Sequence, residues 1–184
     1  LIIGLIVYTY RLHRFSIPQK ISGTANEPFG ARVIMHLAGT RKDPVAYALC
    51  GHLPVYTKVV RYCLIEVFCL GFLLSGYKGS FASYPGPRPS TLMTFISHRT
   101  AFFDDAINDA LTRADNPARQ FVVLGTGFDT RCYDLPEGAD VKCFEVDMTP
   151  TLNAKLAGLR SAGIPHDHVT FVETDFNQQT WFDA

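Results

Sequence analysis

The chain has 184 residues, of which 47% are hydrophobic and 18% charged, so its composition is that of a globular domain and excludes a disordered segment or a coiled coil. Seventeen basic residues balance seventeen acidic ones without any long run of like charge, which argues against an electrostatic nucleic-acid binder. The five cysteines have neither CxxC nor zinc-ligand spacing, so we expect no metal site and free thiols in a reducing compartment, the cytoplasm.

The chain opens with an almost wholly apolar segment, residues 1–7, which is followed by aromatic and basic residues up to Arg14. Seven residues are too few to cross a bilayer, which takes about 20 apolar residues. The segment could be the end of a membrane-spanning helix, because aromatic and basic residues are typical of helix ends at a membrane interface. The simpler alternative is a helix packed on the core, or a frayed terminus. Membrane association through this apolar start therefore stays open beside the cytoplasmic location.

The next two elements are predicted to be helices. Residues 32–38 have helical character and end at Gly39, a residue type that often follows the last helical turn. Asp43 and Pro44 predict a second helix start, with Asp43 as the N-cap and Pro44 in the first turn. We expect this helix to run to Cys50.

Residues 55–74 are the most apolar part of the chain. Lys58, Arg61 and Glu66 interrupt them, so the stretch is not a clean membrane span. The three charges have roughly helical spacing and could share one solvent-exposed face. We therefore expect a buried amphipathic helix, and membrane contact is the alternative.

A loop is predicted over residues 76–89, which contain three glycines and three prolines. Ser90 or Thr91 can cap the helix that follows. Apolar residues recur at helical spacing from there to Leu111, so we expect a long helix.

The C-terminal half alternates strands with helices. Apolar runs at residues 121–124, 141–146 and 169–173 predict three strands, and residues 150–162 predict a helix that ends at Gly163. This alternation is typical of a parallel α/β sheet.

The predicted fold class is therefore α/β, a Rossmann-like parallel sheet with an N-terminal helical cap. Residues 1–89 form the helical segment, which is a cap or lies next to a membrane. Residues 90–184 form the first half of the α/β domain. Because the chain begins with Leu1 and ends at Ala184 just after the third strand, we expect a fragment whose sheet is incomplete at its C-terminal side.

Two glycines follow the first predicted strand, and two carboxylates end the second. Gly125 and Gly127 would let backbone approach a ligand, and Glu145 or Asp147 could accept hydrogen bonds from ribose hydroxyls. We expect one carboxylate to face the ligand, while the other could hold loop backbone. The loop lacks the third glycine of the dinucleotide fingerprint and the Lys of a phosphate loop, which disfavours both of those ligands.

Two further positions could complete a nucleotide-type site. Asp175 follows the third strand at the same sheet edge, where it could accept a hydrogen bond from an adenine amino group with Phe176 against the ring. Arg99 could clamp a ligand carboxylate with two parallel hydrogen bonds. The alternative is that Arg99 pairs with Asp104 or Asp105 on its own helix.

The order of these motifs resembles the leucine carboxyl methyltransferase-like family, which includes bacterial S-adenosylmethionine-dependent methyltransferases. The resemblance covers about residues 99–181, and the N-terminal half is only loosely similar. The motifs that carry it are Arg99-Thr100-x-x-x-Asp104-Asp105, Leu124-Gly125-x-Gly127-x-Asp129-Thr130-Arg131, Glu145-Val146-Asp147, Lys155 with Leu159, and Asp175-Phe176.

The resemblance implies a Rossmann-like methyltransferase fold with S-adenosylmethionine as cofactor. By similarity, Arg99 would hold the methionine carboxylate, and Gly125 and Gly127 would lie under the methionyl and ribosyl part. Asp147 would bind the ribose hydroxyls, with Glu145 beside it.

Asp175 and Phe176 would flank the adenine in such a site. The family usually has an aliphatic residue where Phe176 stands, and alanine where Thr126 stands. The family's later strands, which help to shape the acceptor pocket, would follow Ala184.

The expected activity is O-methylation of a small-molecule or protein carboxylate, or of a hydroxyl. A carboxylate acceptor is already nucleophilic, whereas a hydroxyl acceptor needs a base. We assign no base among His98, His166 and His168, because no motif places any of them. Two alternatives stay open, a dinucleotide-dependent oxidoreductase and a catalytically inactive, membrane-tethered binding module.

Overall fold

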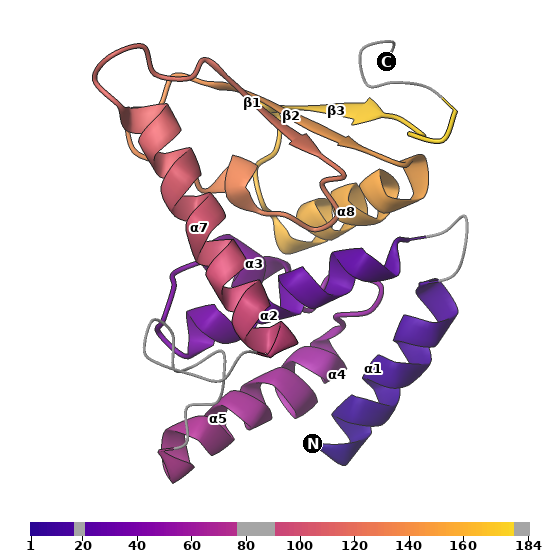
Figure 1. Ribbon diagram of the computed structural model, residues 1–184. Coiled ribbons are helices and arrows are strands. Elements are labelled where there is room, and N and C mark those ends of the chain that lie inside the picture. Colours follow the sequence, from indigo (N-terminus) through magenta and orange to yellow (C-terminus); the bar gives the residue numbers. More distant parts are fainter. Residues whose placement is uncertain (17–20, 77–90, 179–184) are drawn as a thin grey trace.

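The computed structural model describes residues 1–16, 21–76 and 91–178, and its C-terminal half contains a parallel sheet. Within these residues the sheet has three strands in the order β1-β2-β3 (Figure 1), namely β1 Gln120–Leu124, β2 Lys142–Asp147 and β3 Val169–Glu173. The helix α8, Thr149–Ala162, connects β2 to β3 and ends at Gly163, whose φ of 68° suits glycine. The predicted α/β class and the strand–helix–strand order are confirmed.

The first strand is more exposed than the sequence predicts. Val122 and Leu124, which alternation places on one face of β1, are 40% and 49% exposed. The prediction of a buried strand is therefore wrong for this face. The physical reason is that the described helices lie on the other face of the sheet (Figure 1), where Phe121 and Val123 pack against a buried cluster.

Two short helices carry the caps that the sequence predicts. The helix α2, Asn26–Leu37, follows the 3-10 turn η1, Gly23–Ala25, and the chain leaves it through Gly39 with a φ of 71°. The helix α3, Pro44–Leu49, begins at Asp43, whose Oδ1 accepts a hydrogen bond of 2.9 Å from the backbone N–H of Ala46. Both helices are confirmed, because their start and stop signals are local.

The most apolar stretch forms one helical run with an irregular middle. It consists of α4 Lys58–Val60, a π-helical turn η2 Arg61–Ile65, and α5 Glu66–Ser75. None of the α5 residues is buried, so the prediction of a buried helix is wrong for this part of the run. The helix is apolar nearly all round; Cys69 packs against the main core, while the described residues leave most of the other side chains exposed.

The N-terminal helix α1, Ile2–Phe15, packs across the π-helical turn. The contact is closest at Gly4, where a Cβ atom would lie 2.7 Å from the backbone of Cys63 and Leu64. A glycine is needed at this crossing, because any side chain would push the two backbones apart. No helix among the described residues is both long enough and apolar enough to cross a membrane.

The long helix α7, Leu92–Thr112, leads into the sheet. The Thr91 side chain accepts a hydrogen bond from the backbone N–H of Thr94, so the predicted cap is confirmed. The predicted loop over residues 76–89 lies outside the described residues except for Gly76.

The main hydrophobic core joins the helical part of the chain to the glycine loop. Its buried side chains include Phe29 of α2, Leu49 of α3 and Leu159 of α8. Phe128, within the glycine loop, packs edge-on against Phe29 with 6.0 Å between the ring centroids. Figure 1 shows the resulting layers, with α8 beneath the sheet, α2 and α3 below it, and α1, α4 and α5 farthest from the sheet.

Candidate cofactor-binding site

The glycine loop turns sharply at the carboxyl end of β1. Gly125 and Gly127 have φ values of 62° and 52°, in the left-handed region that favours glycine. The backbone N–H groups of Gly125 and Thr126 donate to the Val146 carbonyl at 2.8 and 3.1 Å. These bonds fix the loop against the end of β2.

The two glycines differ in what surrounds them. A Cβ atom on Gly125 would meet nothing within 4 Å, so the backbone there borders open space. A Cβ atom on Gly127 would lie 3.0 Å from the Cβ of Ala25 in η1. Gly125 is therefore open to a ligand, while Gly127 lets the loop approach the helical part of the chain.

Asp147 lies at the tip of β2 and closes the loop from the other side. Its Oδ2 accepts a 2.6 Å hydrogen bond from the Gly127 N–H, and its Oδ1 accepts a 2.7 Å bond from the Met148 N–H. The residue is only 8% exposed. Each carboxylate oxygen can still accept a second bond, so Asp147 both orders the loop and offers acceptors beside it.

Glu145 faces the interior of the protein. Its Oε2 lies 2.6 Å from the Nζ of Lys155 on α8, and neither side chain is exposed. Burial raises the pKa of the Glu145 carboxyl above its ordinary value, and the Lys155 ammonium opposes that rise. Glu145 thus lies next to Asp147 in sequence but offers no exposed surface to a ligand.

Lys155 links this buried carboxylate to the glycine loop. Its Nζ donates a 3.0 Å hydrogen bond to the hydroxyl of Thr126 and lies 5.4 Å from the centroid of the Tyr133 ring. In the sequence, Lys155 stands out only as part of the family pattern. Its contacts show that α8 and β2 support the loop from beneath.

The end of the glycine loop is held by buried polar contacts with the helical part of the chain. The hydroxyl of Thr130 donates to both carboxylate oxygens of Asp43, at 3.1 and 2.9 Å. The same carboxylate lies 2.6 Å from the guanidinium of Arg32 in α2. The N-cap of α3 is therefore also an anchor of the loop, a role that its sequence signal does not suggest.

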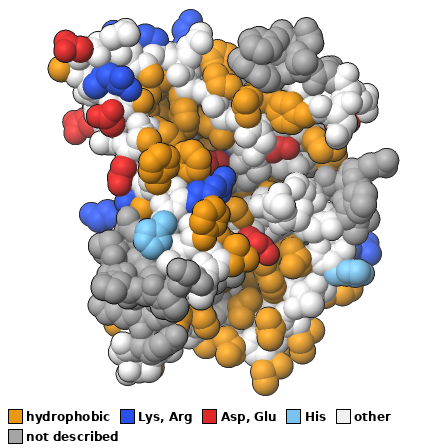
Figure 2. Space-filling model, in the orientation of Figure 1, with side chains coloured by type: hydrophobic (Ala, Val, Ile, Leu, Met, Phe, Trp, Pro, Cys, Tyr) orange, Lys and Arg blue, Asp and Glu red, His pale blue; other side chains and the backbone are white. Residues whose placement is uncertain are grey.

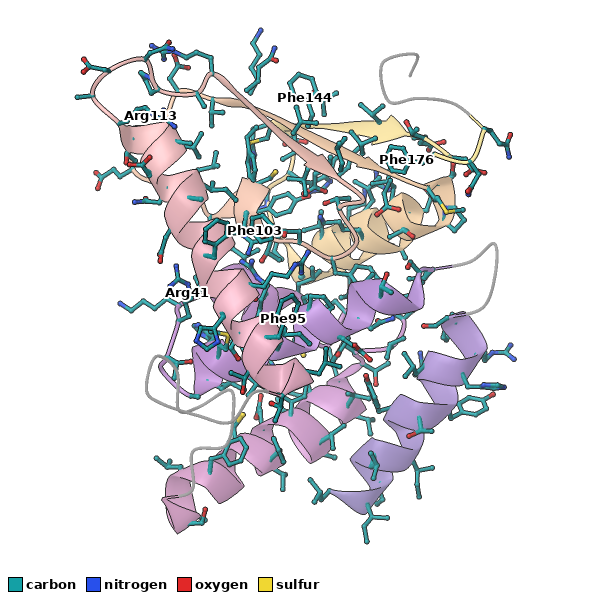
Figure 3. The ribbon with its side chains drawn as sticks, in the orientation of Figure 1. Arg41, Phe95, Phe103, Arg113, Phe144 and Phe176 are labelled. Carbon is teal, nitrogen blue, oxygen red and sulfur yellow. The ribbon has the colours of Figure 1, made fainter. Side chains whose placement is uncertain are left out.

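Arg131 ties the loop to α7. Its guanidinium bonds Asp129 and lies 2.6 Å from Asp104. Asp104 also lies 2.7 Å from the guanidinium of Arg41, and Figure 3 shows Arg41 beside α7. Burial raises the pKa of Asp129, but Arg131 and Arg32 outweigh it and hold the pKa below its ordinary value. Charged residues from three parts of the chain thus form one network.

Arg99 is exposed on α7, one turn before this network. Its guanidinium lies 5.2 Å from the centroid of the Phe103 ring (Figure 3), which is also 6.0 Å from Arg131. The alternative that Arg99 pairs with Asp104 or Asp105 is not the arrangement observed. Arg41 bonds both carboxylates instead.

Asp175 and Phe176 form an exposed turn just beyond β3. The Asp175 carboxylate accepts hydrogen bonds from the backbone and side chain of Asn177 and from Gln178, and these bonds lower its pKa. Phe176 is 47% exposed (Figure 3). The structure therefore places Gly125, Asp147 and this turn at the carboxyl ends of the three strands.

A glycine loop after the first strand of a parallel sheet, with a carboxylate at the end of the second, defines the first half of a Rossmann-like cofactor-binding domain. The comparison with known families is more specific. The chain belongs to the leucine carboxyl methyltransferase family, whose model matches residues 81–184. This confirms the family that the ordered motifs resemble.

Several curated relatives carry the name "Putative S-adenosyl-L-methionine-dependent methyltransferase". One from Mycolicibacterium vanbaalenii is 39% identical over 69 residues, which is 38% of this chain and 22% of the relative. One from Mycobacterium marinum is 37% identical over 81 residues, which is 44% of this chain and 25% of the relative. One from Mycobacterium tuberculosis is 35% identical over 88 residues, which is 47% of this chain and 27% of the relative. The matches thus span about a quarter of the relatives' length.

Proposed function

We propose that the protein is an S-adenosylmethionine-dependent methyltransferase that methylates an oxygen atom of a carboxylate or hydroxyl acceptor. The observation that carries the proposal is the open backbone at Gly125 in a loop whose Gly127 N–H donates to the Asp147 carboxylate, on a chain that belongs to a methyltransferase family. The names of the relatives support the same cofactor.

The residues present fit this cofactor. Gly125 borders open space that a ligand can occupy, and Asp147 keeps acceptor positions for ribose hydroxyls. We assign the adenine end to Asp175 and Phe176, which are accessible at the neighbouring strand end. Arg99, exposed on α7, would bind the methionine carboxylate.

Lys155 and Glu145 have a different role in this proposal. Glu145 is buried against Lys155, so its part in cofactor binding is to support the loop and not to touch the ligand. Lys155 connects Glu145 to the loop, because its ammonium donates a hydrogen bond to the Thr126 hydroxyl.

When bound, S-adenosylmethionine supplies an electrophilic methyl group on a sulfonium with a good leaving group. The protein therefore needs mainly to position the reactants. A carboxylate acceptor would need no general base from the chain. The five free thiols support a reducing location, the cytoplasm.

Isothermal titration of the protein with S-adenosylhomocysteine tests the proposal. We expect saturable binding, and we expect Asp147→Asn to weaken it about tenfold or more, since a hydrogen bond to a charged group is worth about 1.5–3 kcal/mol. Asp167→Asn, in an exposed loop, is the matched control and should bind like the unaltered chain. Absence of binding at millimolar ligand would refute the proposal, and binding of NADH instead would favour an oxidoreductase.

A further inference from the structure

One aromatic ring on α7 lies between two arginine side chains. The guanidinium of Arg99 is 5.2 Å from the centroid of the Phe103 ring, and the guanidinium of Arg131 is 6.0 Å from it. Phe103 is 40% exposed, and Figure 3 shows it near the middle of the helix. Both distances are within the roughly 6 Å over which a ring face attracts a cation, so the ring interacts with both side chains.

The two arginines differ in how their N–H donors are used. The Arg131 guanidinium bonds the carboxylates of Asp129 and Asp104. The Arg99 guanidinium bonds no carboxylate or carbonyl group of the residues that the structure describes, and its contact with them is the Phe103 ring. A ring face attracts the cation without using its N–H groups. The N–H donors of Arg99 therefore stay available to a ligand.

Arg131 connects this part of α7 to the glycine loop. It directly follows the loop in the chain, and its guanidinium lies 3.5 Å from the Thr100 carbonyl oxygen of α7. The turn of α7 that carries Arg99 and Phe103 therefore lies beside the loop proposed to bind the cofactor. Figure 2 shows basic and hydrophobic side chains together over α7, on the face of the molecule in view.

Stacking on the ring limits the conformations of Arg99. An exposed arginine side chain occupies many rotamers, and fixing one of them on binding costs conformational entropy. The Phe103 ring restricts these rotamers before a ligand binds, so less entropy is lost when two parallel hydrogen bonds to a carboxylate form. Arg131 in turn limits where the ring can lie, because ion pairs with Asp104 and Asp129 hold its guanidinium.

We propose that Phe103 is a positioning residue for the amino-acid end of the cofactor. Its ring holds the Arg99 guanidinium beside the glycine loop, where that guanidinium binds the carboxylate of the amino-acid end. The inference rests on the proposed function, because it requires S-adenosylmethionine to bind at the loop. Loss of the ring should therefore lower the affinity for ligands that carry this carboxylate, and for no others.

Isothermal titration of the protein with two ligands tests the proposal. S-Adenosylhomocysteine carries the amino-acid end, whereas methylthioadenosine keeps the adenosine and the sulfur but lacks the carboxylate. Phe103→Leu should weaken S-adenosylhomocysteine binding about two- to fivefold, as expected for an exposed cation–π contact, and should leave methylthioadenosine binding unchanged. Phe103→Tyr keeps the ring and should bind both ligands like the unaltered protein.

Arg99→Gln shows whether the ring acts through the arginine. It should weaken S-adenosylhomocysteine binding about tenfold or more, because hydrogen bonds between charged groups are lost, and should leave methylthioadenosine binding unchanged. The double variant of Arg99→Gln with Phe103→Leu should bind no more weakly than Arg99→Gln alone, because the ring then has no guanidinium to hold.

Phe102→Leu is the matched control, because the Phe102 ring is 69% exposed on the same helix and no cation of the described residues lies on its face. It should bind both ligands like the unaltered protein, and circular dichroism checks that each variant folds. The proposal is overturned if Phe103→Leu weakens both ligands equally or weakens neither, or if Arg99→Gln binds S-adenosylhomocysteine normally. If the unaltered protein binds neither ligand, the cofactor proposal itself fails, and this inference fails with it.

Discussion

The buried pair of Lys155 and Glu145 gives the most direct test of how the glycine loop is supported. Lys155→Met replaces the ammonium with an apolar group of similar length and leaves the Glu145 carboxylate buried without its cation. Removing one partner of a buried ion pair costs about 3–5 kcal/mol, because the remaining charge loses its compensation. For a chain of this size we expect the melting temperature to fall by roughly 6–20 °C.

A double variant tests whether the loss of stability comes from the uncompensated Glu145 charge. Replacing both partners, Lys155→Met with Glu145→Leu, removes the uncompensated charge and should recover most of the free energy of unfolding. About 1 kcal/mol should stay lost, since the Thr126 hydroxyl no longer has the Lys155 ammonium as a donor. Urea unfolding, monitored by circular dichroism, measures each value.

Lys142→Met is the matched control, because Lys142 is an exposed lysine on β2. It should change the free energy of unfolding by less than about 0.5 kcal/mol. The reasoning is refuted if Lys155→Met costs no more than this control. It is also refuted if the double variant is as unstable as the single one.

Two further predictions concern the loop. Because the pKa of Asp129 is lowered in the folded state, its ionised form stabilises the fold above the ordinary carboxyl pKa of about 4, and this stability is lost as the pH falls below that value. The Asp129→Asn variant should therefore have a lower free energy of unfolding at neutral pH, and it should lose less of that free energy in acid. Urea unfolding midpoints, measured across this pH range, check the prediction. Midpoints of the variant that fall in parallel with those of the unaltered chain would contradict it. Gly125→Ala should cost about 1–2 kcal/mol through backbone strain alone, while Gly127→Ala should cost more, because its Cβ would also press on Ala25 at 3.0 Å. Calorimetry of both variants checks the order, and Ala25→Gly should restore part of the Gly127→Ala loss but none of the Gly125→Ala loss.

Elements with local signals could be predicted from the sequence. The cap at Asp43, the stop at Gly163 and the strand at residues 169–173 each depend on a few neighbouring residues, and the structure has all three. The glycine loop and the acid at position 147 could be placed for the same reason, since a parallel strand unit fixes where its ends lie.

The contacts that hold the glycine loop in place could not be predicted in this way. The Asp43 carboxylate and the Thr130 hydroxyl are 87 positions apart in the chain, and no periodicity connects them. The burial of Glu145 depends on where α8 places Lys155. The exposure of α5 could not be predicted either, because the sequence of a helix that is apolar nearly all round does not indicate which side, if any, is covered.

The anchoring of the loop to the first helices bears on how the protein can be divided. A truncated chain that starts near residue 90 would keep every residue proposed to touch the cofactor. It would lose Ala25, Arg32 and Asp43, on which the loop rests. We therefore expect such a truncated chain to lose the shape of the glycine loop, because η1, α2 and the N-cap of α3 hold the loop in place.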